Sequence, residues 1–304
     1  MATVHDIVVR TKRLLNSNTR TELNNFAVAT GGTSTDTSLA LAYKTDGIRA
    51  GSYISIGDGT LKPETMYVRS RNGLAIEVIR GADGSLPQEW TTDAIIEVEP
   101  RFSEHQILEA VRDSIRAMPN NLYAVGHVPV SFSTTQQSVT TPFDDGFTQV
   151  LSATRTARAS EDRLLKFNVK VQEYAGAYEV VRQEGIEKAI TVQLTYAHPF
   201  VTATLDPVTS LEDAVKMQVE LQDIPALGAA ATLVLGEESL RLDLHSQGDS
   251  RSDAAVAAGD RARYSMVLRS QYDRRVSEEA RRLMSKYGVR TGAVVSSVFP
   301  TTVR

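Results

Sequence analysis

The residues that could carry metal chemistry are scattered along this sequence. Its five histidines stand in five separate segments, and none lies three or four residues from another potential ligand in a recognisable metal-binding motif. The sequence therefore predicts no metal site and no cofactor. The five are His5, His105, His127, His198 and His245.

Two glutamates offer the best case for acid–base chemistry. Glu97 and Glu99 are two residues apart in a predicted strand, so their side chains should share one face. Paired carboxylates of this kind serve as general acid and base in glycoside hydrolases, although a solvated strand face gives the same spacing. The sequence holds no nucleophile elbow, phosphate-binding loop or dinucleotide fingerprint. We therefore expect no enzymatic activity, with a hydrolase that uses this pair as an alternative.

Composition excludes several classes of protein. The chain has 304 residues, of which 41% are hydrophobic, so it can bury one large core or two or three small ones. Lysine and arginine number 33 against 37 acidic residues, and this balance disfavours a protein that holds nucleic acid tightly. The absence of cysteine excludes disulfides and thiolate metal sites and fits a reducing cytoplasm. No apolar run approaches about 20 residues, so we expect neither a signal peptide nor a membrane span.

The longest periodic stretch predicts an amphipathic helix over residues 252–288. Apolar residues recur every three or four positions, and Gly288 supplies a stop. At about 1.5 Å per residue this helix would be roughly 50 Å long, more than one domain needs to cover its own core. We therefore expect it to pack beside helices of other subunits, with a solvated face as the alternative for its arginines. The residues expected at the inter-subunit contact are Tyr264, Leu268, Tyr272, Arg274, Arg275 and Arg281.

Three further helical regions are predicted. An N-terminal helix begins near Thr3 and, after a polar break, a shorter helix ends near Phe26. A helix over residues 103–118 begins at a capping box formed by Ser103 and Gln106. Two helices fill residues 210–235, and the small side chains of the segment 228–231 should let a neighbouring backbone approach closely. Together with the long helix, these form the expected helical core of an α+β fold.

Two stretches have the texture of strands. Alternating apolar residues between 38 and 101 predict a small barrel-like module, and Asn72-Gly73 is a strong hairpin signal within it. A second series of short strands predicts a β-sandwich insertion. The expected organisation is residues 1–37 N-terminal helical segment and linker, 38–101 β module, 102–121 core helix, 122–206 β-sandwich, 207–288 helical bundle and 289–304 extended C-terminal tail.

The order of these pieces resembles a known family. The motifs that carry the likeness are RTKRLLN, GSYISIGDG, PETMYVRS, GLAIEVIRGADGS, EPRFSEHQILEAVRDSIRAMPNNLYAV, YAHPFV, DIPALGAAATLVLGEESLRL and RYSMVLRSQYDRRVSEEARRLMSKY. They are similar to head–tail connector (adaptor) proteins of the tailed-bacteriophage neck. The likeness covers most of the chain and consists of apolar and turn patterns without a signature nucleophile.

The resemblance implies a structural virion protein, assembled in the host cytoplasm. It implies a homo-oligomeric ring, a dodecamer, which joins the portal protein to a downstream tail, nozzle or fibre protein and lets double-stranded DNA pass without specific binding. It also implies no contact with a membrane. The C-terminal tail would dock on the portal through Val289, Val294, Val295, Val298, Phe299 and Val303.

A tail-fibre or baseplate protein that binds a receptor or carbohydrate is the alternative function. Such sites need aromatic platforms. Aromatic residues make up 6% of this chain and it has a single tryptophan, so the composition favours the connector.

Overall fold

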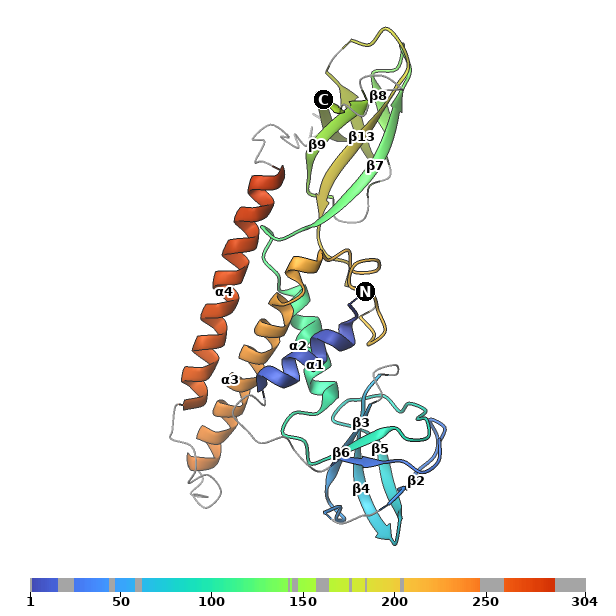
Figure 1. The fold of residues 1–304 in the computed structure, drawn as a ribbon, viewed down its shortest axis with the longest axis vertical. Coiled ribbons are helices and arrows are strands. Elements are labelled where there is room, and N and C mark those ends of the chain that lie inside the picture. The colour runs from blue at the N-terminus through green and yellow to red at the C-terminus, as the bar shows by residue number, and fades with distance from the viewer. Residues whose placement is uncertain are drawn as a thin grey trace, which may run out of the picture. The chain divides into compact units, whose positions relative to one another are not determined.

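Strands outweigh helices in this protein. Among the residues that it describes, the computed structural model in Figure 1 has 34% strand and 30% helix. The predicted fold class, a helical core with β additions, is therefore wrong, because most of the regular structure is β. The structure describes residues 2–15, 25–43, 47–57, 62–141, 143, 147–156, 164–174, 177–183, 185–202, 205–246 and 260–287.

The chain forms two compact units. The first contains the described parts of Met1–Met118 and Val201–Val276, and the second those of Pro119–Phe200 and Ser277–Arg304. The first unit holds a six-stranded β module and most of the helices. The second holds two smaller sheets.

The six strands of the first unit form a curled antiparallel sheet in the order β1-β6-β3-β4-β5-β2. The edge strands β1 and β2 are linked where each ends. The Ala29 N–H donates to the Ala40 carbonyl at 2.7 Å, and the Ala42 N–H donates to the Ala27 carbonyl at 2.9 Å. These bonds join the two edges, which makes the module barrel-like. The strands are β1 (Asn25–Ala27), β2 (Ser38–Ala40), β3 (Tyr53–Gly57), β4 (Glu64–Asn72), β5 (Ala75–Ala82) and β6 (Ile95–Val98).

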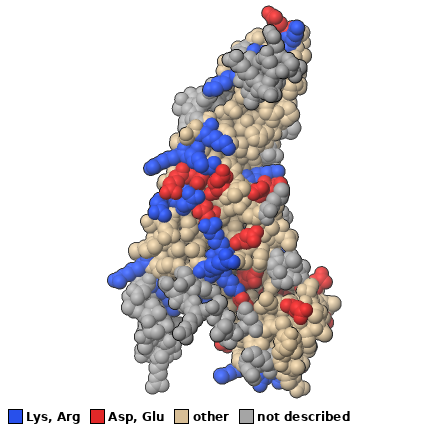
Figure 2. Space-filling view, in the orientation of Figure 1, with Lys and Arg blue, Asp and Glu red and all other residues tan. Residues whose placement is uncertain are grey.

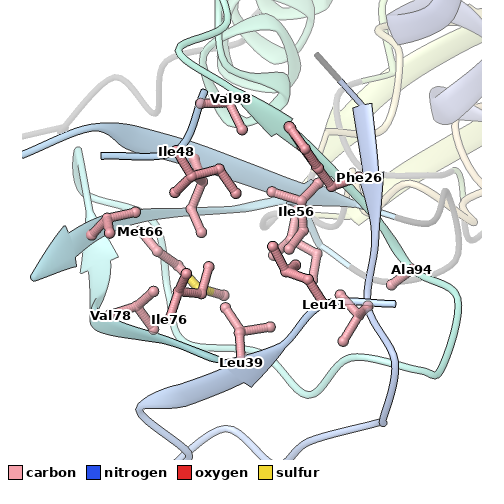
Figure 3. Close-up of a cluster of buried hydrophobic side chains, with 14 of the residues drawn as sticks. Phe26, Leu39, Leu41, Ile48, Ile56, Met66, Ile76, Val78, Ala94 and Val98 are labelled. Atoms are coloured by element: carbon pink, nitrogen blue, oxygen red, sulfur yellow. The ribbon is translucent and has the colours of Figure 1, made fainter. Parts of the chain in front are cut away.

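The interior of the barrel is apolar. Side chains from all six strands meet there (Figure 3). Leu39, Ile54, Met66 and Ile96 have no exposed surface. Because every second residue of a strand points inward, these short strands fill the core with few side chains each. The first strand lies in the segment for which the sequence predicted a second helix, so Phe26 belongs to the sheet and not to a helix.

One buried ion pair ties the barrel to its loops. Glu64 is fully buried and accepts from Arg80 Nε at 2.8 Å and from the backbone N–H groups of Gly81 and Gln88 at 3.0 and 2.9 Å. Arg80 also donates to the Thr33 and Asp36 carbonyls at 3.0 and 2.7 Å. A buried charge needs such partners, so this network fixes the loop that precedes β2.

The helices of the first unit pack on one another. Helix α1 (Val4–Leu15) contacts α2 (Glu104–Arg116) and α3 (Ile224–Ser246), and α2 contacts α3 (Figure 1). The capping box of α2 is present as predicted: the Gln106 N–H donates to Ser103 Oγ, and the Ser103 N–H donates to Gln106 Oε1, both at 3.2 Å.

Two helix boundaries differ from the prediction. Residues 211–218 form a turn, a bend and an irregular segment where a helix was expected, because Lys216 has a φ of 62° that a helix cannot contain. A short 3-10 turn η1 (Val219–Leu221) then leads into α3, which runs well past the predicted end near residue 235. Helix α4 is described from Asp260 to Tyr287, and the predicted start at residues 252–259 lies outside the described residues.

The second unit contains two antiparallel sheets around one core. Phe132 and Leu194 of the four-stranded sheet share this core with Val171 and Val180 of the three-stranded sheet. The first sheet has the order β10-β9-β13-β7 and the second β11-β12-β8. The strands are β7 (Ala124–Phe132), β8 (Ser138–Thr140), β9 (Gln149–Thr156), β10 (Leu164–Lys166), β11 (Val169–Tyr174), β12 (Ala177–Arg182) and β13 (Ile190–His198).

Candidate interaction surface and clefts

Helix α4 lies antiparallel beside α3 (Figure 1). Ser265 Oγ donates to the Ala231 carbonyl of α3 at 2.8 Å. Further along α4, Arg275 Nε donates at 2.8 Å to Oδ2 of Asp223, the residue before α3 begins. Tyr264 Oη donates to the Leu14 carbonyl at 2.8 Å. These bonds fix the first half of α4 along one side.

Small side chains on α3 allow this close approach. A Cβ on Gly228 would lie 2.3 Å from Ser114 Oγ of α2 and 3.2 Å from Tyr272 Cε2 of α4. Ala229 and Ala230 have no exposed surface, and Ala231 is 5% exposed. The prediction that residues 228–231 let neighbouring helices come close is therefore confirmed.

The predicted inter-subunit residues of α4 divide into two groups. Leu268 and Tyr272 are buried within the chain, and Arg275 and Tyr264 bond to groups of the same chain. These four therefore make contacts inside one copy, and their part in an inter-subunit contact stays a prediction. Arg274 and Arg281 are exposed. Their contact with a sister subunit stays a prediction.

The opposite side of α4 carries a row of exposed residues, of which the sequence singled out only Arg274 as a contact. Met266 is 70% exposed and Val267 51%. Helical spacing places them in line with other exposed residues one turn before and two turns after. We call this row the α4 outer stripe; it consists of Arg263, Met266, Val267, Ser270 and Arg274.

Charge is mixed around this helix. On the face shown in Figure 2, acidic and basic side chains lie next to one another without a separate basic area. Arg269 and Asp273 of α4 form an exposed pair at 3.5 Å. Such an arrangement gives a polyanion no continuous basic surface on that face.

Burial affects one titratable group of α4. Desolvation raises the pKa of Tyr272 above its usual value of 10.0, although the charge of Arg269 opposes the shift. In the second unit, burial likewise raises the pKa of Tyr123. Both phenols are therefore held in their neutral form.

A cleft of about 400 Å³ lies between α1 and strands β3 and β6 of the barrel. Lys12 forms an ion pair with Glu97, and His5 Nδ1 lies 3.5 Å from Glu104 Oε1. The Glu104 N–H donates weakly to Ser55 Oγ at 3.4 Å. The titratable groups of this cleft therefore form ion pairs or close contacts with one another, which is typical of a contact between packed elements.

The two glutamates considered for acid–base chemistry have separate partners. Glu97 pairs with Lys12, whereas Glu99 accepts from Ser52 Oγ at 2.9 Å. Strand β6 ends at Val98, and Glu99 has a φ of 47°. The alternation that was expected to place both carboxylates on one face therefore stops between them.

The histidines whose side chains the structure describes do not gather. His127 Nδ1 lies 3.2 Å from Thr195 Oγ1, and His198 Nδ1 lies 2.8 Å from the Pro199 carbonyl. His105 lies on α2, and the side chain of His245 is outside the part of the chain that the structure describes. Among the described residues, no three or more histidine or acidic side chains are placed to hold a metal ion.

A second cleft, of about 280 Å³, lies on the outer surface of the barrel where α2 begins. Tyr53, Thr65 and Arg101 are among its lining residues. Sequence reasoning missed it, because these residues come from β3, β4 and the segment before α2 and have no fixed spacing in the chain.

The predicted portal-docking residues cannot be located on this surface. Val289, Val294, Val295, Val298, Phe299 and Val303 all lie outside the described residues.

One stretch, Val219–Gly236, is long and apolar enough to cross a membrane by length and composition alone. Of this stretch, 56% is buried inside the protein. The core helix of a folded domain meets the same criterion, and α3 packs between other helices.

Comparison with known proteins gives no relative: neither a protein-family model nor a curated protein matches this chain.

Proposed function

We propose that the chain is a structural, non-enzymatic virion protein of a tailed bacteriophage, a head–tail connector that forms a ring between portal and tail. The observation that carries the proposal is the α4 outer stripe. One side of the helix is fixed to α3, whereas Met266 and Val267 on the other side are 70% and 51% exposed. When a partner covers apolar groups of this kind, the complex is stabilised by about 25 cal/mol per Å² of apolar surface removed from water.

A second copy of the chain is the occupant that we infer for the stripe. Residues 260–276 contain five arginines and two aspartates. On α2, Glu109 and Asp113 have side chains that are 43% and 74% exposed, and each is paired with an arginine of the same helix, Arg112 and Arg116. We infer that the stripe meets a different surface of the second copy, and a head-to-tail contact of this kind forms a ring when its rotation closes.

The remaining parts of the proposal follow from the resemblance. The ring would dock on the portal through residues 289–304, contact a downstream tail, nozzle or fibre protein, and pass double-stranded DNA through its channel. The mixed charge in Figure 2 supports passage without tight binding.

Mass photometry of the purified chain tests the ring. We expect a species of many subunits, alone or with portal protein, that dissociates as salt is raised because exposed charges are screened. The double variant Met266→Glu, Val267→Glu should remain monomeric. Ile79→Glu is the matched control, because Ile79 is 52% exposed on β5. A wild-type chain that stays monomeric with and without portal, or a double variant that still assembles, would overturn the proposal.

A truncation tests portal docking separately. Removal of residues 289–304 should leave the ring intact and abolish co-sedimentation with portal protein. If the truncated ring still binds the portal, docking through this tail is refuted while the ring itself stands.

The alternative, a receptor-binding module within residues 122–206, has no specific observation in its favour. The aromatic rings of the second unit pack against one another: the centroids of Phe143 and Phe147 are 4.4 Å apart, and those of Phe143 and Tyr196 4.9 Å. Phe147 and Tyr196 are buried. These rings build the core of the unit and do not form an exposed platform.

A further inference from the structure

The cleft at the start of α2 has the features of a small binding site. It lies wholly within the first unit and measures about 280 Å³. Its lining combines side chains from two strands with the residues that lead into the helix. The polar and aromatic groups that matter are Tyr53, Thr65, Asp83, Arg101, Ser103 and Gln106.

Thr65 supplies the first sign of a ligand. The residue is 3% exposed, and its Oγ1 is buried without a hydrogen-bond partner. Its backbone is satisfied, because the Thr65 N–H donates to Ser85 Oγ at 2.9 Å and Ser85 Oγ donates to the Thr65 carbonyl at 3.1 Å. Buried hydroxyls are nearly always bonded, so an unsatisfied one in the lining of a cleft indicates a missing polar group.

The charges of the cleft disfavour an anion. Arg101 is opposed by Asp83, whose Oδ2 accepts from Gln106 Nε2 at 2.7 Å. The start of α2 would attract an anion if its N–H groups were open. However, Ser103 and Gln106 already cap it through reciprocal bonds of 3.2 Å. A ligand of this site must therefore be close to neutral and must offer both donors and acceptors.

An aromatic ring stands at the edge of the cleft. Tyr53 is 51% exposed, and its ring packs edge-on against Tyr67, with centroids 5.4 Å apart and planes at 68°. This contact fixes the ring without covering it. A fixed aromatic surface beside a carboxylate, a guanidinium and an amide suits a molecule that has an apolar face and several hydroxyl groups.

We infer that this cleft binds a single neutral sugar ring, a pyranose. The C–H face of the sugar would lie against Tyr53, and its hydroxyl groups would bond to Asp83, Arg101 and Thr65 Oγ1. The small volume admits one ring and not an extended chain. The inference is independent of ring assembly, because no residue of the cleft belongs to the α4 outer stripe.

Saturation-transfer NMR on the full chain tests the inference. The probes are methyl glycosides of glucose, galactose and mannose, together with N-acetylglucosamine, and inorganic phosphate serves as an anion competitor. We expect at least one glycoside to bind with millimolar affinity and phosphate not to displace it. Tyr53→Ala and Thr65→Val should each weaken binding roughly tenfold, since each removes one main contact. Tyr43→Ala is the control, because Tyr43 is 82% exposed in the same module and does not line the cleft.

Thermal melting of the same variants separates binding from folding. Thr65→Val keeps the shape of the side chain and removes an unbonded hydroxyl, so the variant should fold as well as the wild type. Loss of binding with unchanged melting supports the sugar site. No saturation transfer from any glycoside at tens of millimolar, binding that survives both substitutions, or displacement by phosphate would each overturn it.

Discussion

Replacing Gly228 with alanine tests how closely α2 and α4 approach α3. Alanine is favoured over glycine inside a helix by about 1 kcal/mol. The new Cβ, however, would lie 2.3 Å from Ser114 Oγ and 3.2 Å from Tyr272 Cε2. Overpacking of this kind costs typically about 1–3 kcal/mol. We therefore expect Gly228→Ala to lower the free energy of unfolding by roughly 1 kcal/mol, because the clash exceeds the gain in helix propensity.

A second substitution isolates the cause. Ser114→Ala removes the Oγ, and the Cβ of residue 114 would then be 3.4 Å from the new methyl group, which is ordinary contact. In that background only the 3.2 Å approach to Tyr272 Cε2 remains tight, so Gly228→Ala should cost less than in the wild type or stabilise by up to about 1 kcal/mol. The interaction between the two sites is thus read as a double-mutant cycle.

Urea unfolding combined with hydrogen exchange in α2 and α3 is the suitable assay, because the chain has two units and a single transition would not assign the loss. If Gly228→Ala alone stabilises the protein, Ser114 rotates away at no cost and the reasoning fails. An unchanged cost in the Ser114→Ala background would show that another contact limits the approach.

Two further predictions concern buried polar groups. Arg80→Met leaves the Glu64 carboxylate buried without its ion-pair partner, so the free energy of unfolding should fall by about 3–5 kcal/mol. The control Arg69→Met changes an exposed arginine and should lower it by at most about 0.5 kcal/mol. Equal losses in the two variants would contradict the role of the ion pair. Because burial raises the pKa of Tyr272, its contribution to stability is present below pH 10.0 and is lost as the pH rises through the higher folded-state pKa. As the pH is raised above 10, the melting temperature should fall less for Tyr272→Phe than for the wild type. Some fall should remain in the variant, because burial also raises the pKa of Tyr123. Equal falls in the melting temperatures of variant and wild type would refute this prediction.

Local signals in the sequence predicted local structure well. The capping box at Ser103 places the start of α2, since its two bonds form within four residues. Asn72-Gly73 predicted a hairpin, and β4 and β5 do form one, although the loop residues are Gly73 and Leu74 and only Gly73 has a positive φ, of 60°. The signal located the turn but was one residue off in its register, because a single glycine suits more than one type of hairpin turn.

Long-range pairing could not be predicted in the same way. Strand β1 has three residues, too few to show an alternation, and it exists because β6 offers a partner about 70 residues later. The turns after Ser210 keep Leu211 and Val215 buried at helical spacing while Lys216 leaves the helical region. Periodicity records which side chains are buried, and more than one backbone can bury the same set. The fold class was wrong for this reason.

The candidate surface shows the same limit. An apolar stripe on α4 indicated burial of Leu268 and Tyr272, and both are buried. The sequence could not show whether α3 of the same chain or a helix of another copy covers them. Met266 and Val267 lie on the side left for a partner, and they became visible only once α3 had been placed against the other side.

This division of α4 into an inner and an outer side separates two causes of failed assembly. Gly228→Ala acts on the inner side, so any loss of the ring should accompany faster hydrogen exchange in α3 and should be restored by Ser114→Ala. The Met266→Glu, Val267→Glu variant acts on the outer side, where no close internal packing is disturbed, so it should lose the ring while exchange in α3 stays as in the wild type. If both variants lose the ring only together with α3 protection, the outer stripe contributes to folding and the contact between copies must lie elsewhere.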